Sequence, residues 1–284
     1  MFKKFLSTIV LGALVLTGCS NGTAEKKEAE TPKQPDNPVL RISTTTSVND
    51  SGLLEMLQPL FEKETGYKLE ITSNGTGQAI KLGESGDADL ILVHAKASEE
   101  EFVNGGFGKE RIPFMYNFFV VAGPKEDAAG VKTSETAKDA FQQIADTDAK
   151  FASRGDESGT HKAEMKIWKS IDVDPVGQDW YISVGKGMGD TLNIANEEQA
   201  YVMTDKATFL SYQKDLDLEI LKEEDDSLKN TYSMIAVNDS VADDINTEGA
   251  QAFIDWMTSE KTLKLISEFG VSEYGEQLFY IIEK

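Results

Sequence analysis

After residue 38, the chain alternates short apolar runs with segments whose apolar residues recur at helical spacing. Val39–Thr46 is rich in β-branched residues and predicts a strand, and leucines recur every three or four residues from Ser51 to Thr65. Asp89–His94 is apolar almost throughout, as expected of a strand covered on both faces of a parallel sheet. Strand–helix alternation of this kind predicts an α/β fold of mainly parallel sheets flanked by helices.

The part of the chain that can fold is long for one hydrophobic core and ordinary for two. Phe114–Gly123 is a long extended apolar segment, which we interpret as the crossing into a second lobe. Tyr232–Val237 is a later strand that would return the chain to the first lobe. The sequence therefore predicts lobe I from residues 39–122 plus 232–284, and lobe II from residues 123–231.

The N-terminus has the pattern of a secretory signal peptide over residues 1–18. A basic start precedes an apolar run too short to span a membrane, and Leu-Thr-Gly-Cys at its end resembles the bacterial lipobox. Cys19 is the only cysteine, so it has no partner for a disulfide within the chain, and we expect it to carry a lipid anchor. Residues 19–38 are polar and contain several prolines, a composition that predicts a disordered tether.

The charge balance limits the classes of partner. The chain has 49 acidic and 28 basic residues and a formal net charge of −21 at pH 7. Such a surface argues against nucleic acid, whose phosphates require a basic footprint. It also opposes long-range attraction of a small anion. An anion site in this chain must therefore depend on hydrogen-bond donors at short range.

Three loops rich in hydroxyl and glycine residues each connect an expected strand to an expected helix. They are Thr44–Ser47, Ser73–Gly77 and Ser153–His161. Ligands of α/β sheets bind beyond the carboxyl ends of strands, and a helix start offers unpaired N–H groups to an anion. Arg154 adds a planar fork of donors, and Ser158 and Thr160 add hydroxyls. Each loop taken alone is also typical of an ordinary turn or helix cap.

Patterns for catalysis are weak. The two histidines, His94 and His161, do not have the spacing of metal ligands. Ser158 lacks the Gly-x-Ser-x-Gly elbow, because Asp156 stands where the first glycine is required. Neither the phosphate-loop pattern nor the dinucleotide glycine pattern occurs. A secreted serine hydrolase that uses Ser158 with His161 or His94 is the alternative function from another class. His161 is also consistent with a place in the first helical turn or with donation to an anion.

Several segments resemble the tungstate-binding lipoproteins that serve tungstate ABC importers. The matching segments are Thr44–Ser47 with Ser51–Leu54, Gly75–Gly77, Gly86–Asp89, Met115–Asn117, Ser153–His161 and Gly187–Gly189. The resemblance implies a two-lobed periplasmic-binding fold of type II, with the oxyanion in the cleft between the lobes. It implies a monomeric protein on the extracytoplasmic face of a bacterial membrane, an ABC transporter permease as partner, no enzymatic activity, no cofactor and no metal except within the oxyanion. It implies ligand-binding roles for Thr45, Thr46, Ser47, Thr76, Gly77, Arg154, Ser158, Gly159 and Thr160.

The types of donor narrow the class of ligand. Tungstate, molybdate and sulfate are fully deprotonated at neutral pH and only accept hydrogen bonds, whereas phosphate keeps a proton for which a carboxylate is a good acceptor. Hydroxyls, amides and one arginine favour the first group, but Asp156 and Asp190 are carboxylates that could serve phosphate. Molybdate- and phosphate-binding receptors of the same fold are therefore alternatives. Neighbouring residues at a strand end face opposite ways, so not every hydroxyl of Thr44–Ser47 can point to the ligand.

Overall fold

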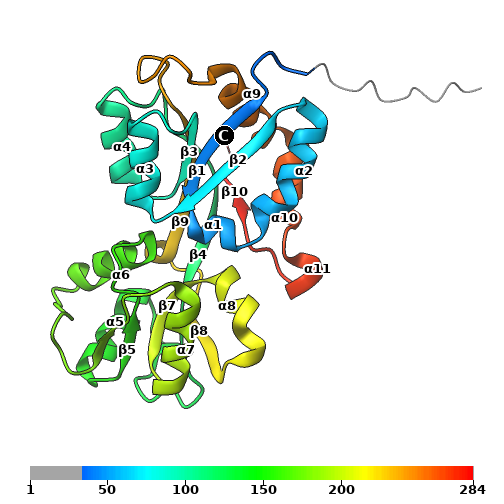
Figure 1. Cartoon of the computed structure of the whole chain (residues 1–284). Coiled ribbons are helices and arrows are strands. Elements are labelled where there is room, and N and C mark those ends of the chain that lie inside the picture. Colours follow the sequence, from blue (N-terminus) through cyan, green and yellow to red (C-terminus); the bar gives the residue numbers. More distant parts are fainter. Residues whose placement is uncertain (1–33, 284) are drawn as a thin grey trace, which may run out of the picture. The chain divides into compact units, whose positions relative to one another are not determined.

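The computed structural model describes residues 34–283 (Figure 1). The predicted signal peptide, Cys19 and all of the tether before residue 34 lie outside the described residues. Residues 34–38, the described end of the tether, contain no helix or strand. Among the described residues, no helix combines the length and the apolar character needed to cross a membrane.

One mixed sheet of ten strands organises this part of the chain. Its order is β2-β1-β3-β9-β4-β7-β5-β6, and β8 and β10 also pair with β4. The strands are β1 (Val39–Thr45), β2 (Lys68–Asn74), β3 (Leu90–Val93), β4 (Ile112–Pro124), β5 (Phe151–Ser153), β6 (Tyr181–Ser183), β7 (Tyr201–Asp205), β8 (Leu218–Lys222), β9 (Lys229–Ala236) and β10 (Tyr280–Ile281). β1 is parallel to β2 and β3, and β5 is parallel to β6 and β7. β4 and β9 are antiparallel to each other and to the neighbours beside them, so the sheet is more mixed than predicted.

Helices flank the sheet. They are α1 (Thr46–Asp50), α2 (Leu53–Thr65), α3 (Thr76–Glu84), α4 (Lys96–Asn104), α5 (Ala137–Asp146), α6 (Gly159–Ser170), α7 (Met188–Glu198), α8 (Lys206–Tyr212), α9 (Thr247–Met257), α10 (Glu260–Glu268) and α11 (Val271–Tyr274). Short 3-10 turns occur at Val131–Thr133, Gln213–Asp215 and Asp226–Leu228. Gly66 ends α2 with a φ of 80°, a left-handed conformation that glycine adopts without strain.

The packing changes along β4. Residues 112–118 of this strand pair with β9, and residues 119–124 pair with β7 and β8. One apolar core includes Phe61 and Phe253, and a separate core includes Phe141 and Trp168. The chain passes from the first packed region to the second through β4 and returns through β9, which begins three residues before the strand expected at Tyr232. The lobe boundaries given above stay a prediction.

Candidate functional site

Three strands lead directly, or through one short loop, into helices whose starts lie together. β1 continues into α1, β2 reaches α3 through Gly75, and β5 reaches α6 through residues 154–158. The first N–H groups of a helix have no partner inside it, so each start can donate to a ligand. A small cavity of about 10 Å³ lies among them. It is lined by Thr45, Thr46, Ser47, Asn74, Gly75, Thr76, His94, Arg154, Ser158, Gly159 and Thr160.

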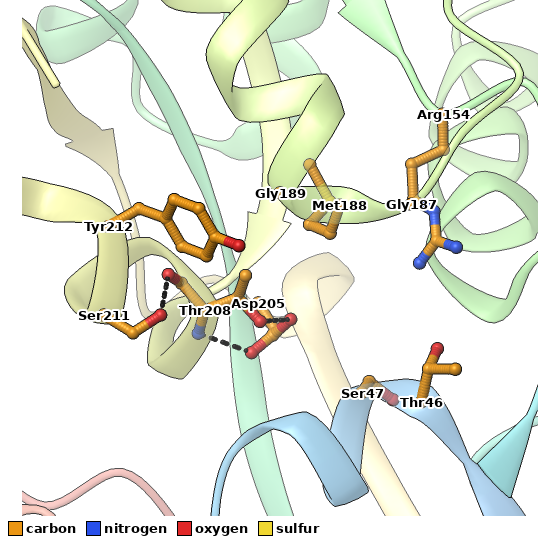
Figure 2. Close-up of a pocket in the computed structure, with 10 residues that line it drawn as sticks. All are labelled: Thr46, Ser47, Arg154, Gly187, Met188, Gly189, Asp205, Thr208, Ser211 and Tyr212. Carbon is orange, nitrogen blue, oxygen red and sulfur yellow. Dashed lines mark hydrogen bonds between the residues drawn. The ribbon is translucent and has the colours of Figure 1, made fainter. Parts of the chain in front are cut away.

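The small cavity gathers all but one of the residues whose binding role the family resemblance implies. Gly77, the second residue of α3, does not line it. An outer cavity of about 240 Å³ shares Thr46, Ser47 and Arg154 with the small one. Figure 2 shows this outer cavity, with the Arg154 guanidinium directed toward Thr46 and Ser47 at the start of α1. The start of α7 and residues along α8 contribute the remaining lining. It includes Asp205, the N-cap of α8, which accepts hydrogen bonds from the Thr208 N–H and hydroxyl at 2.9 and 2.7 Å.

Arg154 is held by its neighbour Asp156. Its Nε and Nη2 atoms lie 3.1 and 2.5 Å from Asp156 Oδ2, while Asp156 Oδ1 accepts from the Ser158 N–H at 3.1 Å. Burial raises the pKa of Asp156, but the hydrogen bonds from Ser158 and the charge of Arg154 outweigh burial and bring the pKa below its usual value. Asp156 is therefore ionised at neutral pH and orients the guanidinium. The sequence pattern did not reveal that a carboxylate already offsets the positive charge of Arg154.

Two buried threonines, Thr44 and Thr76, differ in whether the hydroxyl has a hydrogen-bond partner. The Thr44 hydroxyl donates to the Leu92 carbonyl at 2.8 Å inside the sheet, so it is not available to a ligand. The Thr76 hydroxyl is buried, with 1% of the residue exposed, and it has no hydrogen-bond partner within residues 34–283. Six buried side-chain oxygens among the described residues lack a partner, and Thr76 Oγ1 is the one whose residue lines the small cavity. Because a buried hydroxyl normally forms a hydrogen bond, this one indicates a missing acceptor.

His94, which the sequence analysis considered only as a metal ligand or catalytic partner, lines the small cavity. Its Nε2 atom lies 3.0 Å from Ser47 Oγ, and its ring packs against Tyr232 with centroids 5.0 Å apart. Burial lowers the pKa of His94 to about 4, and its hydrogen bond with Asn230 opposes that shift only in part. His94 is therefore neutral at pH 7. His94 directly follows β3, which lies next to β1. Because ligands bind beyond the carboxyl ends of strands in α/β sheets, its position in the sequence indicates a site residue.

Asn230 belongs to the hydrogen-bond network around His94. Both N–H bonds of the Asn230 amide are used, on Asn117 Oδ1 at 2.9 Å and on the Tyr232 hydroxyl at 3.0 Å. The Asn230 side chain also hydrogen-bonds His94, whose Nε2 atom bonds the Ser47 hydroxyl. The Ser47 hydroxyl also forms a hydrogen bond with the Thr45 hydroxyl, 3.1 Å away. The hydroxyls of Thr45 and Ser47 therefore form one hydrogen-bonded chain that ends at His94.

The loop before α6 combines capping with close approach. Ser158 caps α6, since its Oγ accepts from the His161 N–H at 3.3 Å, and its hydroxyl also hydrogen-bonds Asp156. His161 Nδ1 accepts from the Glu157 N–H at 3.1 Å, which places this ring in the first helical turn and outside the small cavity. A Cβ added at Gly159 would lie 2.5 Å from His94 Cε1 and 3.1 Å from Thr76 Oγ1. Only glycine therefore lets this backbone approach the opposite wall so closely.

The geometry gives no support to the hydrolase alternative. Within residues 34–283, Ser158 Oγ makes no hydrogen bond to a histidine ring, because His94 Nε2 bonds Ser47 and His161 Nδ1 bonds the backbone. Asp190 lies in the first turn of α7, exposed and away from the lining of both cavities.

Comparison with known families matches residues 24–261 to the PBP superfamily domain. The chain belongs to the PBP superfamily. Over 279 residues it is 44% identical to the tungstate-binding protein TupA of Peptoclostridium acidaminophilum, covering 97% of this chain and 96% of that protein. The solved tungstate-binding protein TupA from Desulfovibrio alaskensis G20 matches with a TM-score of 0.79 and 44% identity, over 87% of this chain and 100% of that one.

The tungstate ABC transporter structure from Geobacter sulfurreducens matches with a TM-score of 0.75 and 44% identity, over 81% of this chain and 98% of that chain. These matches confirm the α/β periplasmic-binding class of fold and the resemblance to tungstate-binding proteins that the sequence motifs indicated.

Proposed function

We propose that this chain is an extracytoplasmic solute-binding protein that captures tungstate and delivers it to an ABC importer, without enzymatic activity. One observation carries the proposal. Donors from three separate segments surround one small cavity, in a chain 44% identical over nearly its whole length to a tungstate-binding protein. Two similar solved structures are named for tungstate binding or tungstate transport.

The lining of the small cavity supports a fully deprotonated oxyanion. It offers hydroxyls, backbone N–H groups and one guanidinium, and none of its described lining residues is Asp or Glu. Asp156, one of the two carboxylates considered from the sequence, is occupied by Arg154 and the Ser158 N–H. The small cavity therefore offers no carboxylate of its own to the hydrogen of a protonated phosphate. The donors of the cavity suit tungstate and molybdate alike, so the choice of tungstate is supported by the similar tungstate-binding protein.

Separate donors have separate roles in this proposal. The hydroxyls of Thr76, Ser158 and Thr160 and the Arg154 guanidinium donate to the oxyanion. Hydrogen bonds to a charged group contribute more free energy per bond than those between neutral groups. Gly159 and Gly77 contribute through backbone N–H groups at the starts of α6 and α3. Thr45, Thr46 and Ser47 form the facing wall, where Thr45 and Ser47 are aligned by His94 and α1 starts at Thr46.

Binding requires the walls to part. A cavity of about 10 Å³ has space for roughly one water molecule, and a tetrahedral oxyanion is larger. We propose that residues 39–122 plus 232–284 and residues 123–231 are lobes that open about the two crossings, β4 and β9. The walls belong to different lobes in this division, since Thr45 and Thr76 lie in the first and Arg154 in the second.

The cellular setting follows from the N-terminal pattern and the relatives. We propose cleavage after residue 18, a lipid on Cys19 and a tether over residues 19–38, which together hold the domain at the outer face of the membrane. The partners in this proposal are the tungstate oxyanion and an ABC permease. We propose that the protein acts as a monomer and does not bind nucleic acid.

Thermal denaturation with sodium tungstate, molybdate, sulfate and phosphate tests the proposal. A ligand at a thousand times its Kd stabilises the folded state by about 4 kcal/mol. Tungstate is expected to raise Tm strongly, and phosphate is expected to leave Tm unchanged. A shift with phosphate and none with tungstate would overturn the ligand assignment, and no shift with any of the four would overturn the proposed function.

A further inference from the structure

A third cavity, of about 620 Å³, adjoins the site and differs from the rest of this acidic chain. It shares His94 and Gly159 with the small cavity. Its lining includes five cationic side chains, Lys96, Arg111, Lys162, Lys166 and Lys229, and no Asp or Glu among its described residues. We call it the basic cavity. In a chain with 49 acidic and 28 basic residues, such a lining is not what composition alone would produce.

Three of these cations are not neutralised by a carboxylate. Arg111 pairs with Glu99 at 2.5 Å, and Lys96 lies 3.7 Å from Glu100. Lys162, Lys166 and Lys229 are exposed and form no ion pair with any described residue. The Lys229 ammonium lies 3.8 Å from the centroid of the Tyr116 ring, a contact that keeps its charge. The basic cavity therefore carries a local excess of positive charge.

The sequence of α6 runs against ordinary helix preferences at this place. Lys162 and Lys166 are one turn apart and face the same cavity, and like charges at that spacing destabilise a helix. The first turn of α6 contains no acidic residue, although acids are favoured at a helix start. An anion in the basic cavity would relieve both features.

We propose that the basic cavity is an entry vestibule that concentrates a small inorganic dianionic oxyanion beside the binding site. This inference rests on the proposed function and concerns the route of the same ligand. Cations in a concave space focus the electric potential there and raise the rate of association of an anion. Screening confines the effect to a Debye length of about 8 Å at physiological ionic strength, so the distant carboxylates count for little inside the cavity.

The partition between vestibule and site is thin. Gly159 and His94 line both cavities, and a Cβ on Gly159 would lie only 2.5 Å from the His94 ring. A small parting of these two residues, such as lobe opening would produce, connects the two spaces. The vestibule thereby overcomes, at short range, the repulsion that a net charge of −21 exerts on a dianion.

Stopped-flow binding of sodium tungstate, followed by tryptophan fluorescence, tests the vestibule. The variant Lys162→Gln/Lys166→Gln/Lys229→Gln is compared with Lys63→Gln/Lys138→Gln/Lys214→Gln. The second set is exposed, lines none of the three cavities and removes the same three charges. At low salt the vestibule variant is expected to associate about tenfold more slowly, with an unchanged dissociation rate, and the control to change less than twofold. The difference should disappear at high salt.

Several outcomes would overturn the inference. Equal slowing in both triple variants would assign the effect to net charge alone, and a faster dissociation without slower association would assign the lysines to the bound state. If the vestibule variant does not fold, the salt dependence of tungstate association with the wild-type protein tests the inference instead. A vestibule requires the association rate to fall as salt rises. Repulsion by the net charge would make the association rate increase with salt. Wild-type protein that binds no tungstate would overturn the proposed function itself, a result distinct from intact binding with equal rates in the two variants.

Discussion

Replacing Thr76 by valine should move stability and affinity in opposite directions. The Thr76 hydroxyl is buried and has no hydrogen-bond partner among the described residues, and such an unsatisfied group costs about 1–3 kcal/mol. Valine has the same shape and no polar group. The free energy of unfolding without ligand is therefore expected to rise by about 1–3 kcal/mol. The lost hydrogen bond to a charged ligand is worth about 1.5–3 kcal/mol, which weakens tungstate binding about ten- to a hundredfold.

Thr44→Val is the matched control, because it makes the same substitution at a buried threonine of β1. The Thr44 hydroxyl donates to the Leu92 carbonyl at 2.8 Å, so its removal leaves a buried acceptor without this donor. Unfolding free energy is expected to fall by about 1 kcal/mol, with tungstate affinity unchanged.

Urea denaturation without tungstate gives the two stabilities, and calorimetric titration with sodium tungstate gives the two affinities. The contrast between the variants identifies a polar group kept for a ligand rather than for the fold. If Thr76→Val loses stability as Thr44→Val does and binds tungstate like the wild type, the role assigned to Thr76 is wrong.

The remaining predictions concern His94, Gly159 and Arg154. The pKa of His94 falls from an ordinary value near 6.5 to about 4, so the unfolded chain binds the proton more readily, and stability should fall by up to about 3 kcal/mol as pH drops from 6.5 to 4. Urea denaturation of the wild type and of His94→Gln across this pH range checks the prediction. The free energy of unfolding of His94→Gln should depend much less on pH. Gly159→Ala should weaken tungstate binding more than tenfold in calorimetry, because its Cβ meets His94 at 2.5 Å, whereas Gly77→Ala meets nothing within 4 Å and should bind normally. Arg154→Ala should remove useful tungstate affinity, and Arg154→Lys should not restore it, because an ammonium lacks the planar fork; full affinity in the lysine variant would contradict this.

Much of the fold was accessible from the sequence because local patterns and tertiary structure agree. The apolar run Phe114–Gly123 became β4, Ile112–Pro124, and the leucine spacing from Ser51 to Thr65 became α2, Leu53–Thr65. The antiparallel insertion of β4 and β9 between parallel strands was not predicted. Strand direction depends on which strands become neighbours, and a strand's own residues do not carry that information.

The helix starts were less well predicted. A strand was expected to run to Thr46 and a helix to begin near Ser51, but α1 begins at Thr46 and is only five residues long. Short helices have weak periodicity, so their residues resemble a loop in sequence. The consequence is local but relevant, because Thr46 and Ser47 lie in the first turn of a helix and Thr45 is its N-cap.

The candidate site was predicted in composition but not in its supporting contacts. Hydroxyls and Arg154 stood out because they cluster in the chain. The partners that fix them did not stand out, since Asn230 and His94 are distant in sequence from Ser47. The pairing of Arg154 with Asp156, only two residues apart, also depends on side-chain direction rather than on residue type.

Anomalous diffraction from crystals grown with sodium tungstate, recorded at a tungsten absorption edge, tests the central claim most directly. The account predicts one strong peak within hydrogen-bonding reach of Thr76, Ser158 and Arg154, together with one bound tungstate per chain by calorimetry. A crystal of tungstate-saturated protein with no peak between these residues, or with its peak elsewhere, would contradict the account.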